Sequence, residues 1–384
     1  MRARRLVGHA GLAGIALGAL WAGGPPPSLA RTDGGEIGPR PGVLGARFAL
    51  DGRSVFLLGA SWYGGLGASQ ETLRGDMDAL RQRGFNWVRV WATWRAFGED
   101  VSAVDAEGRP RTQHLVRLKR VLQECGRRGM VVDVTISRGD GSRDTPRLAS
   151  FDAHERAVRT LVESLRPFPN WMLDLANERN VGDARHVPFA DLARLRTLVR
   201  RLDPARLVTA SHGGDISRDE LRRYLREAQV DFVCPHRPRH PGSPGQTEEA
   251  VRTLMGWMRT EGVVVPVHFQ EPFRRGYADW NPGAADFLAD LRGALRGGAA
   301  GWCLHNGAER GTPDGRPRRS FDLRTQALFA QLDPDERRVA DSAHSLVADL
   351  QPGAEHRPWG EGVAYGSRSG GAAHAPGHWR AARP

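Results

Sequence analysis

A unit of about 35 residues recurs along most of this chain: an amphipathic helix ends at a glycine, and a short apolar strand follows at once. The first example has a helical apolar pattern over 73–80, then Gly84 and the strand-like run 85–91. Spacings of three and four place apolar residues on one helix face, and a glycine supplies the left-handed residue that ends the helix. The same order returns at Gly129 and Gly262. Strands that are apolar throughout must be covered on both faces, which predicts parallel strands beneath helices.

Eight segments have the composition of buried strands, and their starts lie about 35 residues apart on average. They are 55–60, 86–91, 130–136, 171–177, 206–211, 230–236, 263–270 and 300–305. Eight such units are what an α/β fold of the (β/α)8 type, the TIM barrel, requires. The alternative is an open doubly wound sheet, which usually has a glycine-rich phosphate-binding turn after its first strand. The first strand here runs into GASWYGG (59–65), which lacks that turn, so we predict the barrel.

The N-terminus has the pattern of a secretory signal peptide: three arginines precede the apolar run 6–22, and small residues lead to a cleavage site after Ala30. The run is short and glycine-rich for a membrane span, so we expect cleavage, no stable membrane insertion, and a secreted or periplasmic protein. The tail contains no Leu, Ile or Phe, which predicts disorder. The predicted divisions are a signal peptide (1–30), a spacer (31–44), a barrel domain (45–350) and a disordered tail (351–384).

The positive charge of the chain comes almost entirely from arginine. The formal charge is +11, with 54 arginines and a single lysine, Lys119, spread along all 384 residues. We interpret this as a coding bias, and we predict no nucleic-acid binding because no basic run with interleaved aromatic residues occurs. The three cysteines, Cys125, Cys234 and Cys303, lie far apart, which indicates buried core residues rather than a disulfide framework or a zinc ribbon.

Two glutamates follow predicted strands at the end where a barrel carries its active site. Glu178 follows strand 171–177, and Glu271 follows strand 263–270. These strands lie on opposite sides of an eight-stranded ring, so the two carboxyl groups can approach each other across the barrel mouth. Cleavage of a glycosidic bond needs such a pair, because one carboxyl protonates the departing oxygen while the other attacks or activates water. A single glutamate there would more often be an ordinary rim carboxylate, but the pair favours catalysis.

Asn177-Glu178 at the end of strand four, with Glu271 ending strand seven 93 residues later, resembles clan A of the retaining glycoside hydrolases. Family 5, the cellulases and mannanases, is the nearest pattern, and the turn at 51–53 before the first strand is similar too. The resemblance covers about residues 45–335. It implies that Glu178 is the general acid/base, that Glu271 is the nucleophile, and that Asn177 bonds the sugar 2-hydroxyl.

The same resemblance assigns roles to Arg89 and His236. Arg89 matches the arginine of strand two, and a guanidinium near Glu271 would keep that carboxylate ionised, while a less polar setting would keep Glu178 protonated. His236 matches a histidine after strand six that contacts the nucleophile or the substrate. The sequence departs from the family at strand three, where 133–137 contains no histidine. It departs again after strand six, where many members have His-x-Tyr and the tyrosine contact is here absent or supplied elsewhere.

Aromatic residues near strand ends could pack against a sugar ring. Among Trp62, Tyr63, Trp91, Trp94 and Trp302, we select Trp62 and Trp91 as substrate-binding candidates because they stand at strand ends. The platform of strand eight is either Trp302 or His305. Arginines after strands six and seven could pair with an anionic sugar such as a uronate, although arginine is more often solvated at the surface. These arginines are Arg237, Arg239, Arg274 and Arg275.

Two other function classes stay open. A metal-dependent barrel hydrolase could combine Glu178 with histidines at or near strand ends, which are His212, His236, His268 and His305. Strand one lacks His-x-His, so we predict no metal and no cofactor. A non-catalytic carbohydrate-binding barrel is the second alternative, and a serine hydrolase is disfavoured because no G-x-S-x-G motif occurs. The prediction is therefore a secreted retaining glycoside hydrolase acting on an oligo- or polysaccharide, whose sugar and linkage are set by the βα loops.

Overall fold

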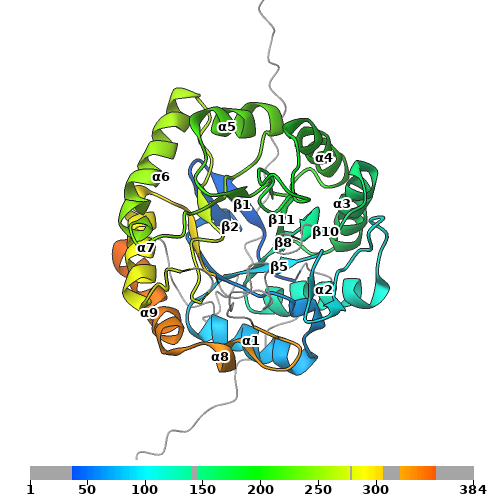
Figure 1. The fold of residues 1–384 in the computed structure, drawn as a ribbon, viewed down its shortest axis with the longest axis horizontal. Helices are drawn as coiled ribbons and strands as arrows, with labels where there is room; N and C mark the ends of the chain where they lie inside the picture. Colours follow the sequence, from blue (N-terminus) through cyan, green and yellow to red (C-terminus); the bar gives the residue numbers. More distant parts are fainter. Residues whose placement is uncertain (1–36, 141–144, 277–278, 306–320, 352–384) are drawn as a thin grey trace, which may run out of the picture. The chain divides into compact units, whose positions relative to one another are not determined.

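The computed structural model describes residues 37–140, 145–276, 279–305 and 321–351, which form a ring of parallel strands inside a ring of helices (Figure 1). The predicted signal peptide lies outside these residues, and so does the predicted tail apart from Gln351. In the described part of the chain, every helix is too short or too polar to cross a bilayer.

Seven parallel strands form one sheet in the order β12-β11-β8-β5-β4-β16-β15. Their bounds are β4 (Leu57–Ser61), β5 (Trp87–Trp91), β8 (Val131–Thr135), β11 (Trp171–Asp174), β12 (Val208–Thr209), β15 (His268–Phe269) and β16 (Gly301–Leu304). The eighth position is β14 (Pro235–His236), which pairs in parallel with β13 (His212–Gly213), just beyond β12. A parallel bridge from Val233 to Val267 joins it to the β15 segment and closes the ring. The predicted (β/α)8 barrel is confirmed.

The first seven helices follow one another around the ring in chain order (Figure 1). The helices are α1 (Gln70–Gln82), α2 (Thr112–Arg127), α3 (Phe151–Leu165), α4 (Phe189–Leu202), α5 (Arg218–Arg223), α6 (Ser243–Thr260), α7 (Ala284–Gly297), α8 (Leu328–Gln331) and α9 (Pro334–Leu350). Helix α8 lies beside α1, and α9 lies beside α7. The predicted glycine stops are confirmed, since Gly84, Gly129 and Gly262 have φ values of 77°, 68° and 67° just after α1, α2 and α6. Only glycine adopts this region without steric cost, so each helix ends where its glycine stands.

The lower end of the barrel interior is filled by apolar side chains, which we call the barrel floor. It comprises Phe48, Leu57, Trp87, Val131, Met172, Leu207 and Phe232. Phe48 comes from a hairpin of β1 (Pro41–Leu44), β2 (Arg47–Leu50) and β3 (Arg53–Val55), and its ring centroid lies 5.2 Å from that of Phe232. Residues 41–44 were expected in a spacer but form β1, because their backbone pairs with the strand that carries Phe48.

Trp87 can fill the floor because the neighbouring strand carries a glycine. A Cβ atom on Gly59 would lie 2.0 Å from Cε3 of Trp87, far inside van der Waals contact. A second apolar layer packs the outward strand faces against the helices, and Cys125 lies in it, while Cys234 and Cys303 lie inside the ring. All three cysteines are buried and free, as the sequence predicts.

Candidate active site

Glu178 reaches the barrel mouth through a left-handed turn just after β11. Its φ is 47°, a conformation that costs a non-glycine residue about 1–3 kcal/mol and that concentrates at functional sites. Ser211 holds the turn, because its hydroxyl accepts a hydrogen bond from the Glu178 amide at 3.0 Å and its carbonyl accepts one from the Arg179 amide at 3.0 Å. The strain therefore fixes the direction in which the Glu178 side chain points.

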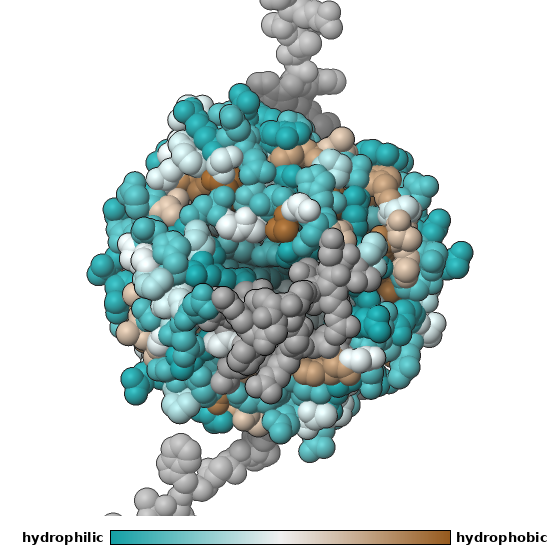
Figure 2. Space-filling model, viewed as in Figure 1, coloured by the Kyte–Doolittle hydropathy of each residue, from teal (hydrophilic) through white to brown (hydrophobic). Residues whose placement is uncertain are grey.

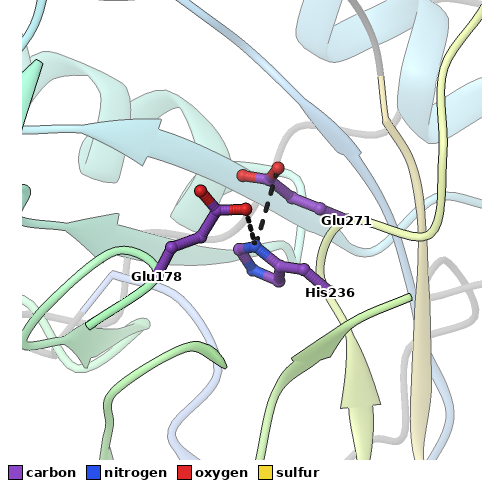
Figure 3. Close-up of side chains that lie close together, drawn as sticks. All are labelled: Glu178, His236 and Glu271. Carbon is purple, nitrogen blue, oxygen red and sulfur yellow. Dashed lines mark hydrogen bonds and ion pairs between the residues drawn. The ribbon is translucent and has the colours of Figure 1, made fainter. Parts of the chain in front are cut away.

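Glu178, His236 and Glu271 converge from three segments of the ring (Figure 3). One carboxylate oxygen from each glutamate and one imidazole nitrogen all lie within 4.8 Å of one another. Nδ1 of His236 is 3.2 Å from Oε1 of Glu178 and 3.6 Å from Oε2 of Glu271. Because both neighbours are acceptors when ionised, Nδ1 must carry the proton. The two glutamates singled out from the sequence thus share one space with the histidine between them.

Glu271 is buried and receives donors on both carboxylate oxygens. Arg89 Nη1 donates to Oε1 at 2.6 Å, as does the Tyr63 hydroxyl at 3.3 Å. Arg239 Nη2 and His305 Nε2 approach Oε2 at 3.0 and 3.2 Å. Burial opposes ionisation, but His236, His305 and Arg89 outweigh it and hold the pKa of Glu271 well below its usual range. Glu271 is therefore an ionised carboxylate in a fixed orientation.

Arg89 joins this carboxylate to the rest of the mouth. It is fully buried, and its Nη2 donates to Asp174 and to Asn177 Oδ1, each at 2.8 Å, while its Nε donates to Thr135 at 2.9 Å. Burial opposes the charge, yet Glu271 and Asp174 raise the pKa of Arg89 above its ordinary value. One guanidinium thus positions both Glu271 and Asn177, and the predicted contact between Arg89 and Glu271 is present.

His305 orients Glu271 from strand eight. Burial lowers the pKa of His305 to about 3, so the ring is neutral. Its Nδ1 accepts a hydrogen bond from the Ser61 hydroxyl at 2.9 Å, which leaves the proton on Nε2 to donate to Glu271. Ser61 is fully buried and serves to fix this tautomer. The tyrosine contact missing after strand six is supplied instead by Tyr63, which follows the first barrel strand.

Glu178 does not have the less polar setting that was expected for a protonated acid. Arg185, in the loop between β11 and α4, forms an ion pair with its Oε2, and His236 occupies its Oε1. Burial favours the neutral form, but the His236 hydrogen bond, together with the charges of His236 and Arg185, lowers the pKa of Glu178 to about 2. The expectation is wrong because a loop arginine reaches back to the strand end, a contact that carries no sequence signal among 54 arginines.

Two of the tryptophans predicted to bind substrate lie elsewhere. Trp62 and Trp302 are fully buried in the layer between strands and helices, where their indole nitrogens donate to Asp76 at 2.9 Å and Asp290 at 2.7 Å. Both predictions are wrong, because these side chains point out of the ring. The position at strand eight that faces the site is therefore His305.

An aromatic stack does adjoin the site. Trp91 lies beneath Arg89 and stacks on Tyr63, with ring centroids 3.9 Å apart and an interplanar angle of 16°. Trp94 packs beside Tyr63 at 4.7 Å and is only partly buried. This stack supports the mouth from the side of β4 and β5.

The four histidines that a metal site would need do not gather around one point, since only His236 and His305 among them contact Glu271. His212 contacts Glu220 at 3.2 Å and Tyr224 at 3.3 Å, and His268 lies in the floor with its ring centroid 4.4 Å from that of Trp87. Among the described residues, the group whose ligand atoms lie close enough together to hold a metal ion is Glu178, His236 and Glu271. Guanidiniums contact both of these carboxylates and would repel a dication there, so the arrangement favours acid–base and nucleophilic chemistry.

The four arginines considered for anionic sugars divide into two pairs. Arg237 forms an ion pair with Asp215, and Arg275 donates to Asp333 at 2.6 Å, so both have structural partners. Arg239 contacts Glu271, and Arg274 lies close enough to Tyr63 and His305 to act on both electrostatically. Only the second pair adjoins the candidate site.

The fold agrees with that of known glycoside hydrolases. A glycoside hydrolase family 5 mannosidase from Rhizomucor miehei superposes with a TM-score of 0.56 at 12% identity, covering 82% of this chain and 98% of that one. GH5_18 from Streptomyces cattleya, in complex with GlcNAc, gives 0.58 at 18% identity, with 78% and 81% covered. The endo-β-1,4-mannanase from Thermotoga petrophila gives 0.53 at 13% identity, with 80% and 79% covered. The fold is therefore a barrel like that of these glycoside hydrolases.

Comparison by sequence adds no closer relative, since no family model and no curated protein matches this chain. The structural similarity therefore supports the barrel fold, which is also the fold that the resemblance in the sequence implies. In the orientation of Figure 1, the surface of the molecule that faces the viewer is largely hydrophilic and has a hollow near its centre (Figure 2).

Proposed function

We propose that this protein is a retaining glycoside hydrolase that acts on an oligo- or polysaccharide. The observation that carries the proposal is the convergence of Glu178 and Glu271 at the barrel mouth, with carboxylate oxygens within 4.8 Å. Retaining enzymes keep their two carboxyl groups about 5–5.5 Å apart, whereas inverting enzymes leave roughly 6.5–9.5 Å for a water molecule. The short separation supports the double displacement over direct attack by water.

In the first step, a carboxylate oxygen of Glu271 attacks the anomeric carbon, the glycosidic C–O bond breaks, and Glu178 transfers its proton to the departing oxygen. In the second step, Glu178 takes a proton from water, the water oxygen bonds to the anomeric carbon, and the ester to Glu271 breaks. Net consumption is one water. Arg89 keeps the nucleophile ionised and holds the Asn177 amide oxygen, which leaves the Asn177 NH2 group for a sugar hydroxyl.

The structural relatives support a carbohydrate substrate, because two of those compared above are named mannosidase and mannanase, and the third, GH5_18, is in complex with GlcNAc. We also propose that the protein works outside the cytoplasm. The support for export is the arginine-rich start, the apolar run 6–22 and the small residues that end at Ala30. Mass determination of the mature N-terminus would test it.

The test compares Glu271→Ala with Glu178→Gln on glycosides that differ in leaving group. Loss of the nucleophile should lower kcat by about 10⁴-fold or more on every substrate. Loss of the acid should lower kcat by about 10²–10⁴-fold on a sugar leaving group, and far less on a dinitrophenyl group, which departs without a proton. Equal losses on both leaving groups would contradict the assignment, and absence of turnover in the native protein would indicate a carbohydrate-binding barrel.

A further inference from the structure

Each of the two candidate catalytic carboxylates forms an ion pair with an arginine from a separate loop. Arg185, between β11 and α4, pairs with Oε2 of Glu178, and Arg239, after β14, donates to Oε2 of Glu271 at 3.0 Å. Their side chains are 16% and 22% exposed, so neither is an ordinary solvated surface arginine. A sugar that enters between the two glutamates therefore meets a cation at each of them.

The Arg185 contact conflicts with the role proposed for Glu178. A general acid must carry a proton when the glycosidic bond breaks, and a guanidinium against its oxygen favours the ionised form. Arg185 must therefore give up Oε2 of Glu178 before catalysis. Asp183 already holds the other edge of the guanidinium, with Nε–Oδ1 at 3.0 Å and Nη2–Oδ2 at 2.6 Å, so Arg185 can stay anchored while it changes its second partner.

We infer that the sugar bound at the cleavage site carries a carboxylate, as in a uronic acid, and that this carboxylate replaces Glu178 as the partner of Arg185. The inference rests on the proposed glycosidase function. The planar guanidinium matches a carboxylate geometrically, so the exchange substitutes one carboxylate for another. A neutral sugar brings no charge to replace Glu178 and has to separate the ion pair without compensation.

The exchange also couples recognition to protonation. Glu178 is faced by His236 from β14, by Glu271 after β15, by His212 from β13, and by Arg185 with Asp183 behind it. When Arg185 turns to the substrate, Glu178 loses a stabilising cation and gains a neighbouring anion, and both changes favour uptake of a proton from solvent. Arg239 presents a second guanidinium at the neighbouring glutamate, where it can share the bound anion.

The experiment measures reducing ends released by the intact protein from matched polymers that differ in the carboxylate. The pairs are polyglucuronate with β-glucan and polymannuronate with β-mannan, beside a sulfated β-glucan. We expect the uronate member of at least one pair to be cleaved with a kcat/KM about tenfold or more above its neutral partner. The product should lack the unsaturated sugar that an elimination would leave.

Arg185→Gln should bring the ratio of uronate to neutral activity down toward one, and Arg239→Gln should lower it in the same direction. Arg222→Gln removes an exposed arginine from α5 and should keep the native ratio. If Arg185→Gln fails to fold, the ratio of uronate to neutral activity in Arg239→Gln tests the recognition of the carboxylate by arginine. Cleavage of neutral or sulfated polymers alone would overturn the uronate substrate but not the glycosidase function. An unchanged ratio in both variants would overturn recognition by the arginines. No cleavage of any polymer would overturn both the uronate substrate and the glycosidase function.

Discussion

The barrel floor and the barrel mouth are built from the same strands, two residues apart, and differ completely in character. On β5 the inward side chains are Trp87 in the floor and Arg89 in the mouth, and on β11 they are Met172 and Asp174. Side chains alternate along a strand, so a step of two residues stays inside the ring while moving up one layer. One layer excludes water and the next concentrates charge above it, which strengthens every ion pair at the mouth.

The largest effect is expected from Arg89→Leu, which removes the guanidinium that links Asp174 and Glu271 at the barrel mouth. The substitution leaves Asp174 and Glu271 buried without their shared guanidinium, and losing one partner of a buried ion pair costs about 3–5 kcal/mol. We expect that decrease in the free energy of unfolding, measured in urea, together with loss of hydrolysis. Arg222→Gln, on the exposed face of α5, should stay within about 0.5 kcal/mol of the native protein. A loss below 1 kcal/mol for Arg89→Leu would show that water replaces the guanidinium.

The next effect separates the two layers. Phe48→Ala removes a fully buried ring from the floor and should lower the free energy of unfolding by about 3 kcal/mol. Because Phe48 packs against Phe232 and His268 in the floor, kcat/KM of the folded protein should stay at the native value. A large fall in kcat/KM with the fold intact would mean that the floor positions the charges above it, and the contrast between the layers would fail.

The smallest effect is a change in pH dependence on a neutral aryl glycoside. Arg185 and His236 lower the pKa of Glu178 to about 2, and kcat/KM reports groups of the free enzyme. The acid must be protonated to act, so activity falls as pH rises through its pKa. Arg185→Gln removes one cation, which raises that pKa and moves the alkaline limb to higher pH, by more than it moves the acidic limb set by Glu271. Arg222→Gln is the control, and an unmoved alkaline limb in Arg185→Gln would contradict the role given to Arg185.

The local sequence pattern predicts where the candidate catalytic residues lie, but it does not predict most of the side chains that contact them. Glu178 and Glu271 could be found because each follows an apolar strand, and strand ends meet at one edge of a barrel. Trp62 follows a strand in the same way, yet its ring turns outward to Asp76, since a residue just past a strand end can face either side. Tyr63 and Glu271 stand 208 residues apart, a separation across which no periodic signal operates.

The sequence by itself determined the alternation of helix and strand, the glycine stops, the barrel, and the height at which two glutamates and Arg89 stand. Those features depend on neighbours within a few positions along the chain, where spacing and backbone preference act directly. Only the tertiary structure decided that Arg185 pairs with Glu178, that Tyr63 and His305 hold Glu271, and that Trp302 is a packing residue. These contacts depend on loop paths and on side chains meeting across the ring, which are fixed by the whole packed chain.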